Sequence, residues 1–223
     1  MIQTSETTDT STTGASQSPG VGPVRRPGEY RAPLPPDART ARLVFERGTA
    51  NDTIVVDPTL AELFVARFEG AVPHVTVTGT EVRIRNLWGR RHRGWITLSG
   101  RVPWAIDVRG GAARVRAELE AVDITEVEIS GGASHVDLEL PAPQRVVPVH
   151  IRGGVSSVTL LRPRTAPVRL AVAGGAAKLA LDEQRFGAVG GPVDLFSSGY
   201  DASEPHYDVR VGGGAHALLI AAR

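Results

Sequence analysis

Hydrophobic and polar residues alternate with a period of two along most of the chain from Leu43 onward. Short runs rich in Val, Ile and Leu are broken by Gly and Pro, and no apolar stripe with the 3.6-residue period of a helix continues for three turns. This pattern predicts many short β-strands. One segment, Pro58–Phe68, is ambiguous, because Asp57 and Pro58 are typical of a helix start while the apolar residues after them also suit a buried strand.

A twelve-residue pattern, apolar-x-apolar-x-Gly-Gly-x-x-x-apolar-x-apolar, recurs five times. Its glycine pairs are Gly110 and Gly111, Gly131 and Gly132, Gly153 and Gly154, Gly174 and Gly175, and Gly213 and Gly214. The first glycines are 21, 22, 21 and 39 residues apart, and a degenerate copy at Gly190 and Gly191 falls inside the longest interval. The residues around Gly79 look like an earlier copy.

The last apolar residue before each glycine pair and the first one after it are seven positions apart. Because this number is odd, a straight strand would direct the two apolar sets to opposite faces. We therefore expect the chain to bend at the pair, where glycine permits positive φ and a close approach of backbones. Small residues follow each pair, which predicts that successive corners stack; they are Ala112 and Ala113, Ala133 and Ser134, Ser156 and Ser157, Ala176 and Ala177, and Ala215.

A repeat of 21 to 22 residues extends to roughly 70 Å, enough for one turn of a flattened coil of three short strands. The sequence therefore predicts an all-β, single-domain parallel β-solenoid (β-helix) of about eight short coils. An antiparallel β-sandwich is the alternative, because regularly spaced strands with turn residues also suit that fold. We expect this domain over residues 41–223, after a disordered tail, residues 1–40, that is rich in Ser, Thr, Gly and Pro.

The glycine-pair units ISGGASHVDLEL, IRGGVSSVTLL and VAGGAAKLALD, together with FGAVGGPVDLFSSGYD, resemble a bacterial β-strand-repeat family of adhesin-like proteins of unknown function. The resemblance extends from about Val75 to the C-terminus. It implies a β-solenoid-like domain and carries over no catalytic residues. The adhesin name implies exposure at a surface.

Composition and charge exclude several classes of function. The 223 residues include 25 basic and 24 acidic ones, and a net charge of +1 gives no overall attraction to nucleic acid or membrane. The absence of cysteine excludes disulfides, thiolate nucleophiles and Cys-ligated metals. No apolar run approaches the length of a membrane span, and the N-terminus lacks the basic start and apolar core of a secretory signal. We expect a cytoplasmic protein without a cofactor or a membrane span.

Charge is unevenly distributed along the chain. Residues 83–116 hold nine arginines and one acid, whereas residues 117–143 hold seven acids and no Lys or Arg. One interpretation is that neighbouring coils compensate each other through cross-strand pairs. A second concerns the segment 86–95, which interrupts the repeat and is typical of an interface or an anion-binding loop; its candidate residues are Trp88, Arg90, Arg91, Arg93 and Trp95. The two tryptophans alternatively suit burial as a plug.

A search for catalytic chemistry finds little. The six histidines, His74, His92, His135, His150, His206 and His216, show no metal-ligand spacing. Ser134 and His135 lie beside Asp137, but adjacent strand residues are expected to point to opposite faces, and no GxSxG elbow occurs. Four glutamates have the i, i+2 spacing of one strand face, but a carbohydrate-active β-helix enzyme would need a longer cleft; they are Glu118, Glu120, Glu126 and Glu128.

We therefore predict a non-enzymatic β-solenoid scaffold or protein-interaction module that associates with itself through its end coils. The segment Pro58–Phe68 is expected to cap the N-terminal end. The run Leu218–Ile220 is expected to leave an open edge at the C-terminal end, which favours end-to-end dimers. The alternative is an anion- or nucleic-acid-binding protein that uses the Arg/Trp-rich loop, for which binding would depend steeply on salt.

Overall fold

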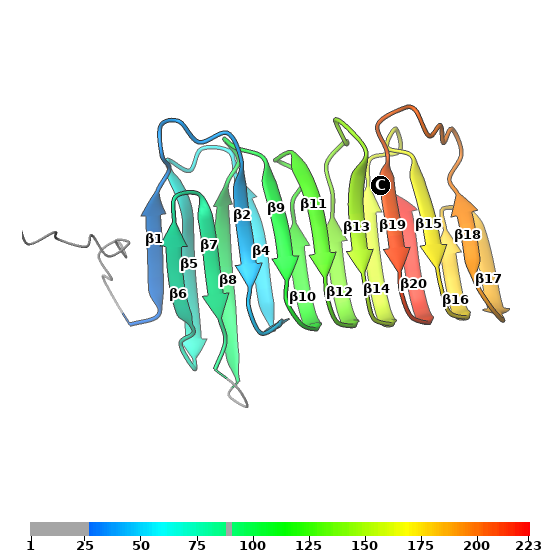
Figure 1. The fold of residues 1–223 in the computed structure, drawn as a ribbon, viewed down its shortest axis with the longest axis horizontal. Coiled ribbons are helices and arrows are strands. Elements are labelled where there is room, and N and C mark those ends of the chain that lie inside the picture. Colours follow the sequence, from blue (N-terminus) through cyan, green and yellow to red (C-terminus); the bar gives the residue numbers. More distant parts are fainter. Residues whose placement is uncertain (1–26, 88–90) are drawn as a thin grey trace, which may run out of the picture.

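The computed structural model describes residues 27–87 and 91–223, which form twenty β-strands and no helix. The prediction of an all-β protein is confirmed. The strands make two sheets that face each other along the length of the molecule (Figure 1). The eleven-stranded sheet has the order β1 (Glu29–Pro33), β5 (Glu62–Gly70), β8 (His92–Ser99), β4 (Asp52–Asp57), β10 (Ala112–Glu118), β12 (Ala133–Glu139), β14 (Val155–Arg162), β20 (Ala215–Ala222), β16 (Ala176–Leu181) and β17 (Gln184–Val189), with β3 (Thr49–Ala50) beside β10. The nine-stranded sheet has the order β18 (Val193–Phe196), β15 (Val168–Val172), β19 (Tyr207–Val211), β13 (Val147–Ile151), β11 (Ile124–Ile129), β9 (Trp104–Val108), β2 (Ala41–Phe45), β7 (Glu81–Arg85) and β6 (His74–Thr78).

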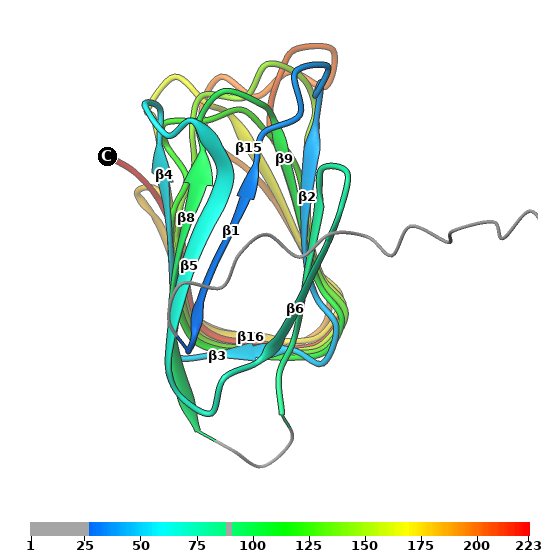
Figure 2. The same ribbon diagram turned by 90° about the vertical axis from the view of Figure 1, so that its left-hand side faces the viewer.

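Each of the five glycine-pair units contributes one strand to each sheet. The chain leaves the nine-stranded sheet, turns at the glycine pair and enters the eleven-stranded sheet, as from β11 to β12. Of the eighteen strand pairings, thirteen are parallel. Viewed along the long axis, the two sheets form walls that are joined by a floor, where the short strand β3 lies (Figure 2). The floor is therefore built from the stacked corners.

Strand order in space differs from order in the chain at both ends. The unit of β19 and β20 lies between the units of β13–β14 and β15–β16, and the unit of β2 and β4 lies between those of β7–β8 and β9–β10. The expected open edge at Leu218–Ile220 is wrong, because β20 pairs with β14 on one side and with β16 on the other. Leu218 and Ile220 are buried.

The ends of the molecule are made by strands that turn back. β16 pairs antiparallel with β17 and β15 with β18, so the degenerate copy at Gly190 and Gly191 is a return between the sheets rather than another parallel unit. The region around Gly79 is likewise the hairpin of β6 and β7. At that same end the segment Pro58–Phe68 contributes β5, which is a strand and not a helix, and β5 pairs antiparallel with β8.

Strand β1 lies within residues that the sequence analysis placed in the tail. It pairs antiparallel with β5, and Ala32 is buried. The surrounding prolines conceal this strand in the sequence, because the composition of residues 1–40 is typical of disorder while an edge strand tolerates Pro33. Residues 1–26 lie outside the described part of the chain.

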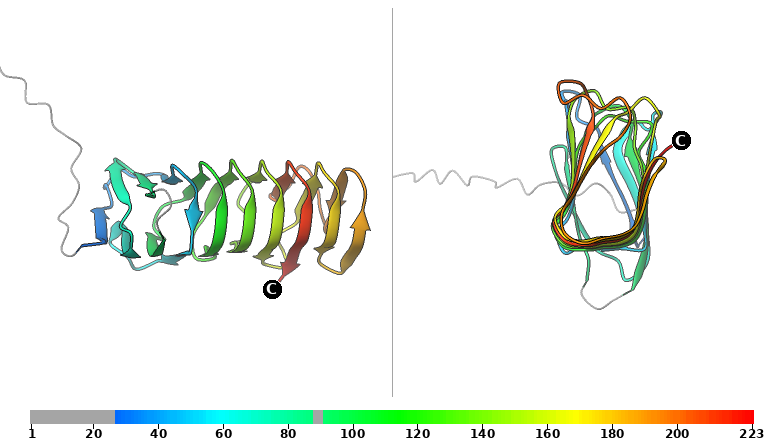
Figure 3. Two further views of the ribbon diagram at one scale, coloured as in Figure 1. Left: turned by 90° about the horizontal axis from the view of Figure 1, so that it is seen from below. Right: turned by 90° about the vertical axis from the view of Figure 1, so that its right-hand side faces the viewer.

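Successive corners line up along the molecule, as the view from below shows (Figure 3), and the corner glycines contact one another. Gly131 N donates to Gly110 O at 2.7 Å, and Gly153 N donates to Gly131 O at 3.0 Å. A Cβ atom added at Gly153 would lie 2.7 Å from Gly132 N. Among the five pairs, only Gly110 has positive φ, at 139°. Glycine is therefore required at the other corners by the close approach of neighbouring backbones and not by backbone conformation.

The bend expected at the glycines continues three residues later. The third residue after each pair has φ between 52° and 55°, the left-handed conformation; these residues are Arg114, His135, Ser157, Lys178 and Ala217. The two residues before the next buried valine or leucine both face outward as a result, and the small residue directly after the pair, such as Ala133, faces inward and is buried. A left-handed bulge, rather than glycine φ, thus returns the apolar positions to the interior.

Candidate functional site

A sixth corner, which the sequence analysis missed, joins β2 to β4. Thr49 pairs with Ala112, and Asn51, with φ of 59°, occupies the left-handed position. The pair here is Arg47 and Gly48, so one arginine replaces a glycine. The single remaining glycine explains why the pattern search passed over this unit.

Polar side chains fill the interior of this corner, where the other units have apolar ones. Asp52 stands where the neighbouring unit has Val115, and its side chain is fully buried. It accepts a short hydrogen bond from the Thr49 hydroxyl, and His92 Nε2 lies 3.1 Å from its Oδ1 atom. A buried carboxylate needs such partners, because an unpaired charge in the interior is costly. The His92 ring is thereby held in place, with its side chain 6% exposed.

A pocket of about 550 Å³ opens next to this buried cluster. Thr49 and His92 form part of its wall, and Asn86 and the corner backbone at Gly111 form another part. The Asn86 amide donates to Gly48 O at 3.0 Å, while its Oδ1 atom is buried without a hydrogen-bond partner among the described residues. The arginines on the pocket wall are Arg47, Arg91 and Arg114.

The predicted interaction loop is only partly placed by the structure. Trp88 and Arg90 lie outside the described residues. Arg91 lines the pocket described above, whereas Arg93 and Trp95 lie on β8 and face outward. Arg93 stacks over the Trp95 ring at 5.9 Å from its centroid, and Arg67 does so at 5.8 Å. Trp95 is 36% exposed, so its alternative interpretation as a buried plug is wrong.

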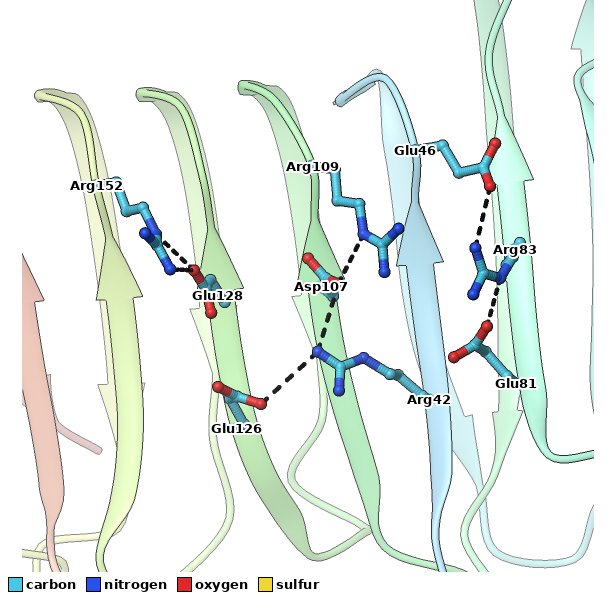
Figure 4. Close-up of polar contacts among 9 residues, drawn as sticks. All are labelled: Arg42, Glu46, Glu81, Arg83, Asp107, Arg109, Glu126, Glu128 and Arg152. Atoms are coloured by element: carbon cyan, nitrogen blue, oxygen red, sulfur yellow. Dashed lines mark hydrogen bonds and ion pairs between the residues drawn. The ribbon is translucent and has the colours of Figure 1, made fainter.

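The uneven charge along the chain becomes an array of ion pairs on the outer face of the nine-stranded sheet (Figure 4). At its centre Asp107 accepts from Arg109 at 3.1 Å and from Arg42 at 3.4 Å. Asp107 is only 7% exposed, and Val44, which lies beside it on the same outer face, is fully buried. Two guanidinium groups therefore compensate the charge of this largely buried aspartate.

The array continues across the sheet in both directions. Arg83 on β7 binds Glu81 and also Glu46, the latter at 3.4 Å. Further pairs are Arg42 with Glu126, Arg152 with Glu128, Arg210 with Asp208, and Arg169 with Asp194. The two stretches of opposite charge in the sequence compensate each other only at Arg116, which binds Glu118 and Glu139. The other paired acids of residues 117–143 bind arginines from outside both stretches. Exposed pairs of this kind contribute about 0–1 kcal/mol each.

The carboxylates considered for carbohydrate chemistry do not face one another. Glu118 lies on β10 in the eleven-stranded sheet and binds Arg116 at 2.7 Å, whereas Glu126 and Glu128 lie on β11 in the other sheet. The remaining one, Glu120, pairs with Arg223. Each is engaged by an arginine, and no described pocket is lined by two of them.

Ser134 and His135 both face outward, so the expectation that they point to opposite faces is wrong. The left-handed conformation of His135 turns its side chain to the same side, and Ser134 Oγ lies 2.9 Å from His135 Nδ1. No described carboxylate is hydrogen-bonded to His135. Within residues 27–87 and 91–223 no group of three or more metal-ligating side chains occurs.

Comparisons with known proteins agree with this architecture. Residues 72–161 match the N-terminal domain of toast_rack, DUF2154. A solved structure described as a "putative cell adhesion protein" from Clostridium sporogenes ATCC 15579 matches with a TM-score of 0.65. It covers 87% of this chain and 98% of that chain at 18% sequence identity, which shows a shared fold.

The toast_rack match and the adhesion-protein neighbour support the resemblance to a bacterial β-strand-repeat family. No curated protein matches the chain. The described residues contain no helix long and apolar enough to cross a membrane.

Proposed function

We propose that the protein is a short parallel β-solenoid that acts as a non-enzymatic interaction module and pairs with a second copy of itself through the end formed by β17 and β18. The parallel pairing of successive units and their constant spacing of 21 to 22 residues support the solenoid. The description of the structural neighbour as a cell adhesion protein supports a role in binding rather than catalysis.

The observation that carries this proposal is a pair of free strand edges at one end. β17 is the last strand of the eleven-stranded sheet and β18 is the last strand of the nine-stranded sheet (Figure 1). The Gln184 side chain donates to Phe196 O at 2.9 Å and joins the two edges. Strand edges present unpaired backbone donors and acceptors, which another strand can satisfy.

Apolar side chains accompany these edges. Phe186 and Leu195 pack against the core but are only partly buried, and Phe196 is 45% exposed. Charge offers little protection there, since β17 carries Arg185 alone and Asp194 of β18 is neutralised by Arg169 at 2.9 Å. A second copy related by a two-fold axis would extend both sheets and cover this apolar end.

At the opposite end, the edge strand β1 has features that discourage strand addition. β1 contains Pro33, and its register with β5 shifts between Ala32 and Pro33. It also carries charges at Glu29 and Arg31. Proline, irregular register and charge are the means by which natural sheets protect their edges. The pairing is therefore proposed for the β17–β18 end.

The test is the mass of the protein by light scattering over a concentration series. The wild type is expected to move from 23.6 kDa toward twice that mass as concentration rises. Phe186→Lys places a charge on the proposed contact and should keep the protein monomeric. Val77→Lys makes a matched change at a partly buried position of β6, at the other end, and should still dimerise. A wild type that is monomeric throughout, or equal loss of dimer in both variants, contradicts the proposal.

A further inference from the structure

The pocket at the Arg47 corner gathers arginines whose charge no described acid compensates. Of the 21 described arginines, twelve form an ion pair with a described acid and nine do not. Three of these nine, Arg47, Arg91 and Arg114, line the same pocket. No acidic side chain lines it among the described residues. Each of the other four described pockets has at least one acidic residue in its lining, so this combination of three unpaired arginines and no acid is particular to the Arg47 corner.

Two adjacent corners bring two of these arginines together. Arg47 occupies the first corner position of the β2–β4 unit, where the other units have glycine. Arg114 follows the glycine pair of the neighbouring unit, and its Nε donates to Asn51 Oδ1 at 2.7 Å. That contact fixes Arg114 without neutralising it. The ladder between β3 and β10, in which Thr49 pairs with Ala112, places the two corners side by side.

The wall of the pocket is built from polar groups that are themselves held in place. Thr49 and His92 line it, and both are fixed by the buried carboxylate of Asp52. Asp52 does not line this pocket, so it acts as a positioning residue for His92. Keeping the buried Asp52 carboxylate where the neighbouring unit has valine is costly for the core. In return, the carboxylate holds Thr49 and His92 in fixed positions on the pocket wall.

The remainder of the pocket combines apolar side chains and backbone with the polar side chains of Asn51, Asn86 and Ser134. Leu87 is 49% exposed at its edge, and Ala112 and Ala113 form part of the wall. Its volume of about 550 Å³ is within the range of small-molecule sites, roughly 300–1,000 Å³. Three guanidinium groups beside an apolar surface suit a ligand with one compact, doubly charged group and one apolar group.

We infer that this pocket binds an organic phosphate, with the phosphate among Arg47, Arg91 and Arg114 and the apolar part of the ligand against Leu87 and Ala112. Guanidinium groups bind phosphate oxygens through paired, charge-assisted hydrogen bonds. The inference is independent of the proposed pairing of copies, because β17 and β18 lie at the other end of both sheets. Of the five residues predicted for the interaction loop, the proposed phosphate site includes Arg91 alone.

Calorimetric titration with phenyl phosphate tests the inference. The full chain is expected to bind it with a saturable isotherm, and to bind phenol, which lacks the phosphate, much more weakly. The double variant Arg47→Gln with Arg114→Gln should bind phenyl phosphate at least about tenfold more weakly. The matched control is Arg39→Gln with Arg101→Gln, which removes two arginines that also lack ion-pair partners among the described residues and do not line this pocket. This control should bind as the wild type does.

Two results would overturn the inference: no saturable binding by the wild type, or equal weakening in both double variants. Circular dichroism of each variant shows whether it is folded. Sedimentation with vesicles of phosphatidate and phosphatidylcholine then distinguishes the sources of the phosphate. Vesicle binding that phenyl phosphate displaces assigns the site to a lipid headgroup, whereas phenyl phosphate binding without vesicle binding assigns it to a soluble ligand.

Discussion

Replacing one corner glycine by alanine tests how the units of this protein are held together. In Gly153→Ala the new methyl group would lie 2.7 Å from Gly132 N, 2.8 Å from Gly131 C and 2.9 Å from Gly131 O. All three atoms belong to backbone, so no flexible side chain can move aside. Ordinary contacts are near 3.5 Å, and the two corners would have to separate by roughly 0.7 Å.

This separation weakens the hydrogen bonds that join the corners. Gly153 N donates to Gly131 O at 3.0 Å, and Arg152 N donates to Ile129 O at 2.9 Å. Overpacking costs about 1–3 kcal/mol, and each weakened hydrogen bond up to about 1 kcal/mol. We expect the free energy of unfolding to fall by about 3 kcal/mol, and the melting temperature by roughly 6–12 °C for a chain of this size.

Urea and thermal unfolding followed by circular dichroism measure this effect. The matched control is Gly187→Ala, because nothing lies within 4 Å of a Cβ atom added there and its φ is not in the left-handed region. We expect the control to change the free energy of unfolding by less than about 0.5 kcal/mol. Equal stability of the two variants would refute the view that close backbone packing requires glycine at the corners.

Three further predictions concern other parts of the fold. Ala217→Gly should stabilise the protein by about 0.5–1 kcal/mol, because φ of 53° is unfavourable for alanine. Ala221→Gly on the same strand should destabilise the protein, because glycine weakens a strand interior. The urea midpoint of each variant measures the effect. Burial raises the pKa of Tyr207, so its contribution to stability is complete below pH of about 10 and is lost as the pH rises further. As the pH rises from neutral to alkaline, the urea midpoint of Tyr207→Phe should therefore decline less steeply than that of the wild type. Asp107→Asn should cost about 1–2 kcal/mol and make stability less sensitive to salt, as urea unfolding at low and high salt would measure.

Controls make these three predictions decisive. Asp194→Asn removes a pair whose acid is 46% exposed and should cost less than about 0.5 kcal/mol. An alkaline profile of Tyr207→Phe identical to that of the wild type would contradict the role of the buried phenol, which donates to Pro141 O at 2.8 Å. Destabilisation by Ala217→Gly would contradict the left-handed bulge.

Much of the repeating architecture could be predicted from the sequence. The five glycine pairs recur at regular positions because neighbouring backbones lie too close for a side chain at corners such as Gly131 and Gly153, and such a constraint is visible in one sequence. The apolar positions on either side are equally regular. The left-handed bulge was hidden, since its residues, such as Arg114, His135 and Ser157, share no chemistry. The requirement falls on the backbone there, and several residue types meet it.

The order of the units could not be predicted. All units present the same alternating pattern, so any two could pair, and the pattern does not say that β20 lies between β14 and β16. The predicted C-terminal edge was wrong for this reason. The corner at Arg47 was missed because one arginine breaks its glycine pair, and the polar residue Asp52 breaks its apolar pattern. These two departures from the repeat mark the pocket.

The measurement that most directly tests the proposed pairing is hydrogen exchange of backbone amides at low and high protein concentration. We predict that amides of β20 are protected at both concentrations, because that strand is paired on both sides. Amides of β17 and β18 should gain protection only at high concentration, when a second copy covers their edges. Concentration-independent exchange in β17 and β18, or protection gained at β1 and β6 instead, would contradict the account.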